Sequence, residues 1–319
     1  EVAEANGLPL DGTSLWLDWL VALAVHRLPQ APDVYRLGDG SLGALAMDGV
    51  TGPSSFDTTV RQYAADYYDL QGDVPVSIQF EGSTQVPLLG TPAASGHHYW
   101  YAQRVNYSQI QLERDVDLRE VNAATLNYEV YHDIELGYDF AYVSVSEDGG
   151  VTWQGLTAGG MQGLAPTDDP GDAALTERFY TGQSNSWVQE SIDLTAYAGS
   201  EIKLRFSYVT DPILTFGGLA LDNISIPEIG FYDDAEAAAE GWQAQGFTRA
   251  TASLPETWHL QLVTFAGGTP QVTALAVDDA GNLTHTLDLA QSDGEAILIV
   301  AATAPMTLEE AQYRLEIGD

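Results

Sequence analysis

Short runs in which apolar and polar residues alternate dominate the chain from Val60 onward. Alternation with a period of two places one set of side chains on a buried sheet face and the other in solvent. Turn residues bound the runs, a spacing that is typical of antiparallel sandwiches. The runs include QIQLERDVDL, ATLNYEVYHDI, DFAYVSVS, EIKLRFSYV, LALDNISI, TWHLQLVTF and EAILIVAATA. The sequence therefore predicts an all-β protein.

Two sandwiches are predicted, because the pattern breaks at Pro227 and Glu228 and strands restart after them. We expect an antiparallel jelly-roll sandwich over 73–227 and a smaller β-sandwich over 228–319. A chain of 319 residues is long enough for two domains, each with its own core. The remaining segment, 1–72, is predicted to be a short helix followed by a connector rich in Pro, Gly, Asp and Ser.

The helical segment, 14–27, is apolar around most of its circumference, so more than one face requires burial. Two interpretations stay open. The helix is the last helix of a domain that lies upstream, or it packs on a sheet of this same chain. The first predicts that the isolated chain associates through Trp16 and Trp19. The apolar run Leu15–Leu28 carries charged residues and is too short to span a bilayer.

Charge and cysteine content exclude several classes of partner and site. The chain has 46 acidic and 11 basic residues, a net charge of −35. Binding to DNA or RNA needs a basic face, and anionic lipid would repel so acidic a surface. The absence of cysteine excludes disulfides, thiol catalysis and Cys-ligated metal sites. The excess of carboxylates favours bound divalent cations, above all calcium.

One short motif predicts a structural hairpin. Residues 146–153 (SEDGGVTW) fit the Asp-box pattern S-x-D-x-G-x-T-W. In such a hairpin the Asp side chain bonds turn amides, the glycines accept positive φ, and the Trp covers the turn. We therefore expect no binding or catalytic role for it.

Longer blocks carry a family resemblance. Residues 187–199 (WVQESIDLTAYAG), then EIKLRFSYVTD and LALDNISIPE, together with 131–143 (YHDIELGYDFAYV), resemble the MAM-like jelly-roll domain of secreted immune inhibitor A-type metallopeptidases. The ordered blocks span about 97–227, and the helix LWLDWLVALAV is similar to the final helix of the peptidase-type domain that precedes the jelly roll. The resemblance implies a bacterial protein that is secreted or at the cell surface, with this chain as its carboxy-terminal portion.

The zinc-binding motif of that family is not found in this chain. In His-Glu-x-x-His, two histidines on one helix face bind zinc and the Glu activates water. None of the six histidines here has that spacing, and the adjacent His97 and His98 would point to opposite faces of a strand. There is no G-x-S-x-G elbow and no P-loop either. We expect no zinc and no catalytic residue in the chain, although the resemblance implies a zinc metallopeptidase as the parent protein.

A first candidate calcium site is implied by the resemblance. In jelly rolls related to MAM domains, a carboxylate near the first strand and an Asp in the last strand share one calcium ion. Glu81 and Asp222 match these positions. Asp222 interrupts the alternation of its strand, so it is either a ligand or a turn anchor, because an unpaired buried carboxylate would be costly.

Two further carboxylate clusters are candidate cation ligands. Asp133, Glu135 and Asp139 span one turn in DIELGYD and repel one another unless a cation or amides neutralise them. Another cluster follows the predicted domain break and comprises Asp233, Asp234 and Glu236.

Together these observations indicate a calcium-stabilised, non-catalytic accessory region of a secreted immune inhibitor A-like metallopeptidase. The expected partner is the upstream peptidase domain or a second copy, bound through the N-terminal helix and the sheet edges. Two alternatives stay open: a structural subunit of an extracellular filament, surface layer or adhesin, and a carbohydrate-binding module. Aromatic clusters such as Tyr99-Trp100-Tyr101 could stack sugars, but aromatics at sandwich positions are more often core.

Overall fold

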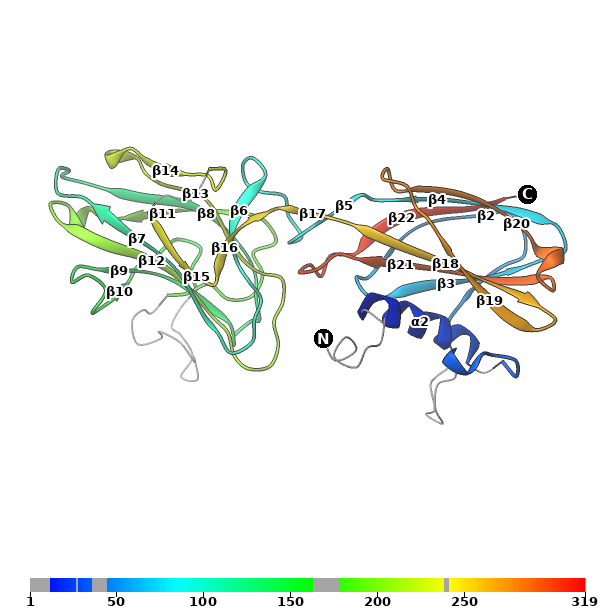
Figure 1. Cartoon of the computed structure of the whole chain (residues 1–319). Helices are drawn as coiled ribbons and strands as arrows, with labels where there is room; N and C mark the ends of the chain where they lie inside the picture. Colours follow the sequence, from blue (N-terminus) through cyan, green and yellow to red (C-terminus); the bar gives the residue numbers. More distant parts are fainter. Residues whose placement is uncertain (1–11, 27, 36–44, 163–177, 238–240, 319) are drawn as a thin grey trace. The chain divides into compact units, whose positions relative to one another are not determined.

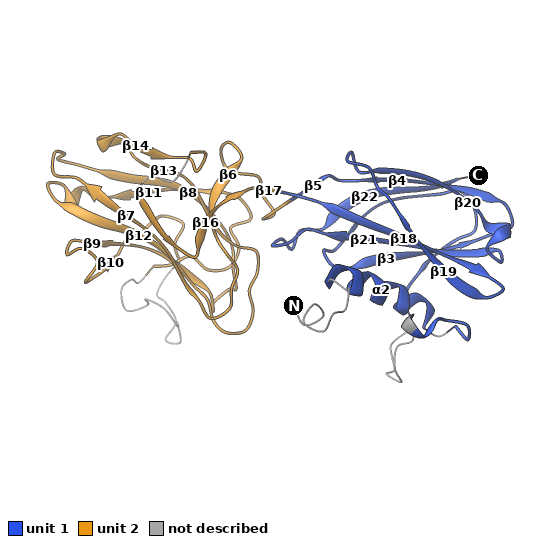
Figure 2. Cartoon of the chain, viewed as in Figure 1, with its two compact units in different colours: residues 1–86, 254–319 blue, residues 87–253 orange. Residues whose placement is uncertain are grey.

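A computed structural model describes residues 12–26, 28–35, 45–162, 178–237 and 241–318, and the all-β prediction with a short N-terminal helix is confirmed (Figure 1). The chain divides into two units, which we call unit 1 (residues 1–86 and 254–319) and unit 2 (residues 87–253) (Figure 2). Unit 1 is therefore built from both flanks of the segment that forms unit 2.

Unit 1 is a sandwich of two sheets, with the strand orders β1-β3-β21-β18-β19 and β2-β22-β4-β20. All of its strand pairs are antiparallel except β1–β3 among those described. Its elements are α2 (Gly12–Val25), η1 (Asp33–Tyr35), β1 (Asp48–Val50), β2 (Ser54–Val60), β3 (Ala65–Gln71), β4 (Pro75–Gly82), β18 (Thr257–Ala266), β19 (Thr269–Leu275), β20 (Asn282–Asp288), η4 (Leu289–Gln291), β21 (Glu295–Thr303) and β22 (Ala311–Gly318).

Helix α2 packs on a sheet of its own chain, as the second interpretation of the helix predicted. Its buried side chains, Leu20 among them, form one apolar cluster with Ile297 and Ile299 of β21, whereas Leu298 and Val300 of the same strand belong to the other core cluster of unit 1. A strand covered on both faces is apolar at almost every position, which explains the run EAILIVAAT.

Unit 2 is a jelly-roll sandwich of two antiparallel sheets. One sheet has the order β11-β8-β13-β6-β16, with β14 paired to β13, and the other has the order β10-β9-β12-β7-β15. Its elements are β6 (His98–Ala102), β7 (Gln109–Asp117), β8 (Thr125–Asp133), β9 (Phe140–Ser146), β10 (Gln154–Gly155), β11 (Val188–Asp193), η2 (Thr195–Tyr197), β12 (Glu201–Val209), β13 (Gly218–Ile226), η3 (Pro227–Ile229), β14 (Phe231–Asp233), β15 (Trp242–Gln245) and β16 (Phe247–Thr251). Strands β5 (Gln85–Pro87) and β17 (Ser253–Pro255) form a separate two-stranded pair.

The structure divides the chain at other places than the boundaries predicted at 72/73 and 227/228. Strand β4, expected to open the jelly roll, pairs with β20 and β22 in unit 1. Strands β15 and β16, expected in the second sandwich, pair with β7 and β6 in unit 2. The break at Pro227 is the short helix η3 inside unit 2. Alternation in the sequence identifies a strand but not the strand with which it pairs. In the sequence, a turn within one unit therefore cannot be told from a boundary between two domains.

The Asp-box hairpin has the predicted contacts. The Asp148 carboxylate accepts hydrogen bonds from the amides of Val151 (3.0 Å) and Thr152 (2.8 Å). The hydrogen bond from the Thr152 hydroxyl, together with these amide bonds, lowers the pKa of Asp148 to about 2. Trp153 closes the hairpin, and the Arg205 guanidinium carbon lies 3.4 Å from its ring centroid. The motif is a structural hairpin.

Candidate functional site

Three carboxylates at one end of unit 2 form the candidate metal centre. Glu135, Asp139 and Asp211 each offer one oxygen, and these oxygens lie within 4.8 Å of one another. Glu135 and Asp139 belong to the turn between β8 and β9, and Asp211 follows β12. Strands β9 and β12 are paired through Phe140 and Val209, so the residues just beyond that pair meet.

Asp139 is the buried member of the centre and is 0% exposed. Its Oδ1 accepts a hydrogen bond from the Asp211 amide (3.1 Å), and its Oδ2 accepts one from the Tyr208 hydroxyl (3.2 Å). Glu135 Oε2 is also buried and has no hydrogen-bond partner among the described residues. An unsatisfied buried carboxylate oxygen beside two further carboxylates is energetically unfavourable without a counter-charge.

The electrostatics of the centre favour binding of a cation or a proton. Burial, assisted by the Asp211 charge, raises the pKa of Asp139 to about 6. Burial and the same Asp211 charge also raise the pKa of Glu135. Within the described ranges, no basic side chain forms a salt bridge with any of the three. A set of carboxylate oxygens is the donor set that calcium prefers, so the residues fit that ion.

Two of the three residues predicted for this cluster, Glu135 and Asp139, belong to the centre. The third, Asp133, does not, and Asp211 takes its place. Asp133 is turned to other partners: its Oδ2 accepts a bond from the Gly217 amide (3.0 Å) and its Oδ1 one from Gln183 Nε2 (2.6 Å). Asp211 was missed. The signal available in the sequence was an acidic residue two positions after the alternating run EIKLRFSYV, but only the β9–β12 register shows which turn it meets.

The predicted pair of Glu81 and Asp222 is not a local site. Glu81 lies on β4 in unit 1, opposite Asn282 and Arg314 in the sheet register, whereas Asp222 lies on β13 in unit 2. The family resemblance matched Glu81 to a carboxylate near the first strand of the jelly roll, and the sheet pairing of β4 places it in the other sandwich.

Asp222 makes the contacts of a turn anchor, one of the two roles that its sequence position left open. Its side chain is buried and accepts hydrogen bonds from the amides of Ser95 (3.0 Å) and Asn223 (2.8 Å). A β-bulge follows it, with Asn223 at φ +50°. Burial raises the pKa of Asp222 to about 6.

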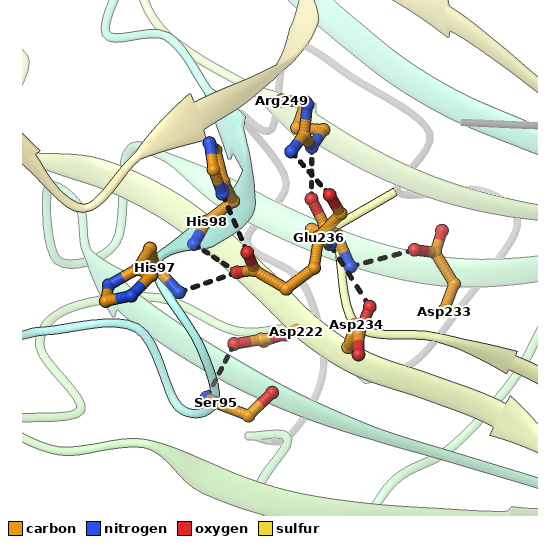
Figure 3. A network of polar contacts seen from close by, with 9 residues as sticks. Ser95, His97, His98, Asp222, Asp233, Asp234, Glu236 and Arg249 are labelled. Atoms are coloured by element: carbon orange, nitrogen blue, oxygen red, sulfur yellow. Dashed lines mark hydrogen bonds and ion pairs between the residues drawn. The ribbon is translucent and has the colours of Figure 1, made fainter. Parts of the chain in front are cut away.

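In the third predicted cluster, the carboxylates contact nitrogen atoms of the protein itself (Figure 3). Glu236 Oε1 accepts hydrogen bonds from the amides of His97 and His98, each 2.6 Å long, and His98 Nδ1 lies 3.0 Å from Oε2. These contacts lower the pKa of Glu236 to about 2. Gly96 has φ +60°, and a Cβ there would lie 2.4 Å from Glu236 Oε1. The loop before β6 is thus shaped around this carboxylate.

The neighbouring acids are engaged in the same way. Asp234 Oδ1 accepts a bond from the Glu236 amide (3.1 Å) (Figure 3), and Asp233 Oδ2 accepts bonds from the indole nitrogens of Trp100 (3.1 Å) and Trp242 (2.5 Å). Amide, indole and imidazole nitrogens thus lie within hydrogen-bond distance of these carboxylates. This cluster therefore connects the loop before β6 to the segment after β14.

The aromatic cluster considered for sugar stacking lies in the fold interior. Tyr99, Trp100 and Tyr101 are all buried on β6. Trp100 packs in the core of unit 2. No helix among the described residues is both long enough and apolar enough to span a membrane.

Comparison with known proteins agrees with the family resemblance of the sequence blocks. Residues 76–252 match the family described as immune inhibitor A-like, MAM domain. The chain is 29% identical over 163 residues to the pre-pro-metalloprotease PrtV of Vibrio cholerae, which is 50% of this chain and 16% of that protein. It is 30% identical over 152 residues to immune inhibitor A of Bacillus thuringiensis subsp. alesti (46% and 20%). It is 26% identical over 151 residues to bacillopeptidase F of Bacillus subtilis (45% and 9%). The matched stretch thus covers a small part of each relative.

Proposed function

The chain belongs to the immune inhibitor A-like MAM domain family, and from this we propose that it is a non-catalytic, calcium-stabilised accessory region of a secreted metallopeptidase. The family match over 76–252 is the observation that carries the proposal. The name of the Vibrio relative supports it, since that protein is a metalloprotease of which the matched stretch is only 16%. The upstream peptidase domain is the proposed partner, and the proposed location is extracellular.

Calcium has a specific structural role in this proposal. An ion held by Glu135, Asp139 and Asp211 would join the β8–β9 turn to the segment after β12 and neutralise a buried carboxylate cluster. Because the unfolded chain does not hold the three groups together, the ion stabilises only the folded state. At a hundredfold excess of ion over its dissociation constant, this linkage contributes about 2.7 kcal/mol.

The calcium proposal is tested by thermal unfolding in CaCl2 and in EDTA. We expect a higher Tm in calcium for the wild-type chain, and no calcium effect in a Glu135→Gln, Asp211→Asn double variant. Glu120→Gln, at an exposed acid elsewhere in unit 2, serves as the matched control and should keep the full calcium response. Equal Tm values for the wild-type chain in calcium and EDTA would refute the site.

The accessory role is tested in the protein encoded by the full reading frame. Deleting residues 87–253 should leave hydrolysis of a short peptide unchanged and lower kcat/KM on a folded protein substrate, because the module is proposed to act on presentation of the substrate. The isolated chain, incubated with zinc and casein, should release no peptides. Casein hydrolysis by the isolated chain that a zinc chelator abolishes would contradict the non-catalytic assignment.

A further inference from the structure

Six large exposed apolar side chains belong to three loops, 103–108, 134–139 and 210–217, at the end of unit 2 that carries the carboxylate centre. Tyr107 and Ile213 are each 78% exposed, Leu136 is 66% exposed and Tyr138 is 58% exposed. Val105 and Leu214 complete the set, which we call the loop-tip patch. Side chains this exposed are open to solvent over most of their surface. A cluster of projecting apolar groups on a soluble domain marks an interaction surface.

The three loops are joined by hydrogen bonds, so the tips are presented together. The Tyr107 amide donates to the Asp211 carbonyl (2.6 Å), and Asn106 Nδ2 donates to the Ile213 carbonyl (2.9 Å). The Asp211 amide donates to Asp139 Oδ1 (3.1 Å), and the Asp139 amide donates to the Glu135 carbonyl (3.1 Å). The loop-tip patch and the carboxylate centre are therefore parts of one hydrogen-bonded assembly.

The chemistry of the tips fits the interface of a lipid bilayer. Transfer of aliphatic side chains from water to the acyl region is favourable. Tyrosine can bury its ring there while its hydroxyl stays at the level of the headgroups. A protein partner would have to offer a complementary pocket for each exposed side chain, whereas a fluid lipid interface can adapt to all of them. The three loops also contain one basic residue, Arg104, which suits headgroup phosphates.

Charge decides the lipid class and the condition for binding. The net charge of −35 disfavours anionic membranes. Glu135, Asp139 and Asp211 lie among the tips, so approach to lipid would desolvate three carboxylates unless a cation neutralises them. We propose that the loop-tip patch inserts into the surface of a zwitterionic bilayer when calcium occupies the carboxylate centre. This inference rests on the calcium site proposed above.

The test is co-sedimentation of the full chain with phosphatidylcholine vesicles in calcium and in EDTA. We expect binding in calcium and its loss in EDTA. A Tyr107→Ser, Ile213→Ser double variant should lower the partition coefficient at least about tenfold, because two large apolar groups leave the interface. Val151→Ser is the control, since Val151 on the Asp-box hairpin is similarly exposed, and this variant should bind like the wild-type chain. Circular dichroism verifies that each variant is folded.

The outcomes separate this inference from the calcium proposal. If calcium raises the Tm but the wild-type chain stays in the supernatant, lipid insertion is overturned and the calcium site stands. Vesicle binding that is equal in calcium and in EDTA overturns the cation requirement. A calcium-dependent dimer in light scattering, lost in the double variant and without vesicle binding, would identify a second copy as the occupant and overturn the lipid assignment.

Discussion

Carboxylates have different environments in unit 2. Asp222 and Glu236 both accept hydrogen bonds from backbone amides. Contacts with His98 and the amides lower the pKa of the partly exposed Glu236 to about 2, whereas burial outweighs the amide bonds of Asp222 and raises its pKa to about 6. Asp139 is as deeply buried as Asp222, and in addition it faces the carboxylates of Glu135 and Asp211. Local sequence predicted that Glu135 and Asp139 are close, because four residues in one turn cannot separate them. It could not predict Asp211, whose approach depends on the pairing of two strands.

The raised pKa of Asp139 predicts how stability depends on pH. The folded chain holds the Asp139 proton up to about pH 6, whereas an unfolded Asp loses it near pH 4. The protonated group thus stabilises the fold below pH 4, and this contribution is lost as the pH rises through 6. In EDTA, we expect the free energy of unfolding to fall by about 1–2 kcal/mol over this range on account of Asp139.

The comparison of the wild-type chain with Asp139→Asn isolates this effect. Urea unfolding at pH 4.5 and pH 7 should give a smaller decrease for the variant, because the amide does not titrate. Asp222, whose pKa is raised in the same way, contributes to both proteins and cancels in the difference. In calcium the order should reverse for the wild-type chain, since the ion needs the deprotonated carboxylate. An identical pH dependence in both proteins would contradict the assignment.

Secondary structure was predictable from local patterns, and the partners of each element were not. The alternating runs mark the strands because a half-buried strand has period two. The apolar circumference of 14–27 marks a helix that needs cover, but the sequence did not show whether the cover lies in this chain. The strand over Glu295–Thr303 held a second clue: it is apolar on both faces, as a strand beneath a helix must be.

Removing a buried side chain of α2 should destabilise unit 1. Leu20 is 3% exposed and packs on β21, so Leu20→Ala should lower the free energy of unfolding by about 2–4 kcal/mol. Leu15→Ala, on the exposed side of the same helix, should change it by less than about 0.5 kcal/mol. Urea unfolding followed by tryptophan fluorescence measures both. Equal effects of the two substitutions would mean that the helix does not dock on the sheet.

At the scale of the whole molecule, the flanks of the chain come together around an uninterrupted middle segment. Strands β2 and β4 lie beside β22, and β3 lies beside β21. The linear order of strands predicted two consecutive sandwiches, because local sequence carries no information on pairing between distant segments. The number of sandwiches and the jelly roll were predictable, whereas the limits of each sandwich required the sheet registers.

Fragments test these limits directly. Residues 87–253 contain every strand of unit 2 and should unfold in one cooperative thermal transition by circular dichroism. Residues 73–227 lack β14, β15 and β16, and with them the core residue Phe247, so this fragment should show no such transition. Residues 228–319 lack β1 to β4 and should not fold alone. A cooperative transition in 73–227 that matches that of 87–253 would contradict the division.

The nested layout of unit 1 also fixes the order in which the nascent chain can mature on the ribosome. Strand β4 emerges early, yet its neighbour β22 is translated only after all of unit 2. The last strand of unit 2 is complete once Thr251 has emerged. Unit 2 can therefore fold before the strands that pair with β4 have been translated. During that interval the apolar faces of β3 and β4 are uncovered. A slow stretch of translation after residue 253 would prolong the period in which these strands are open to aggregation or to a chaperone.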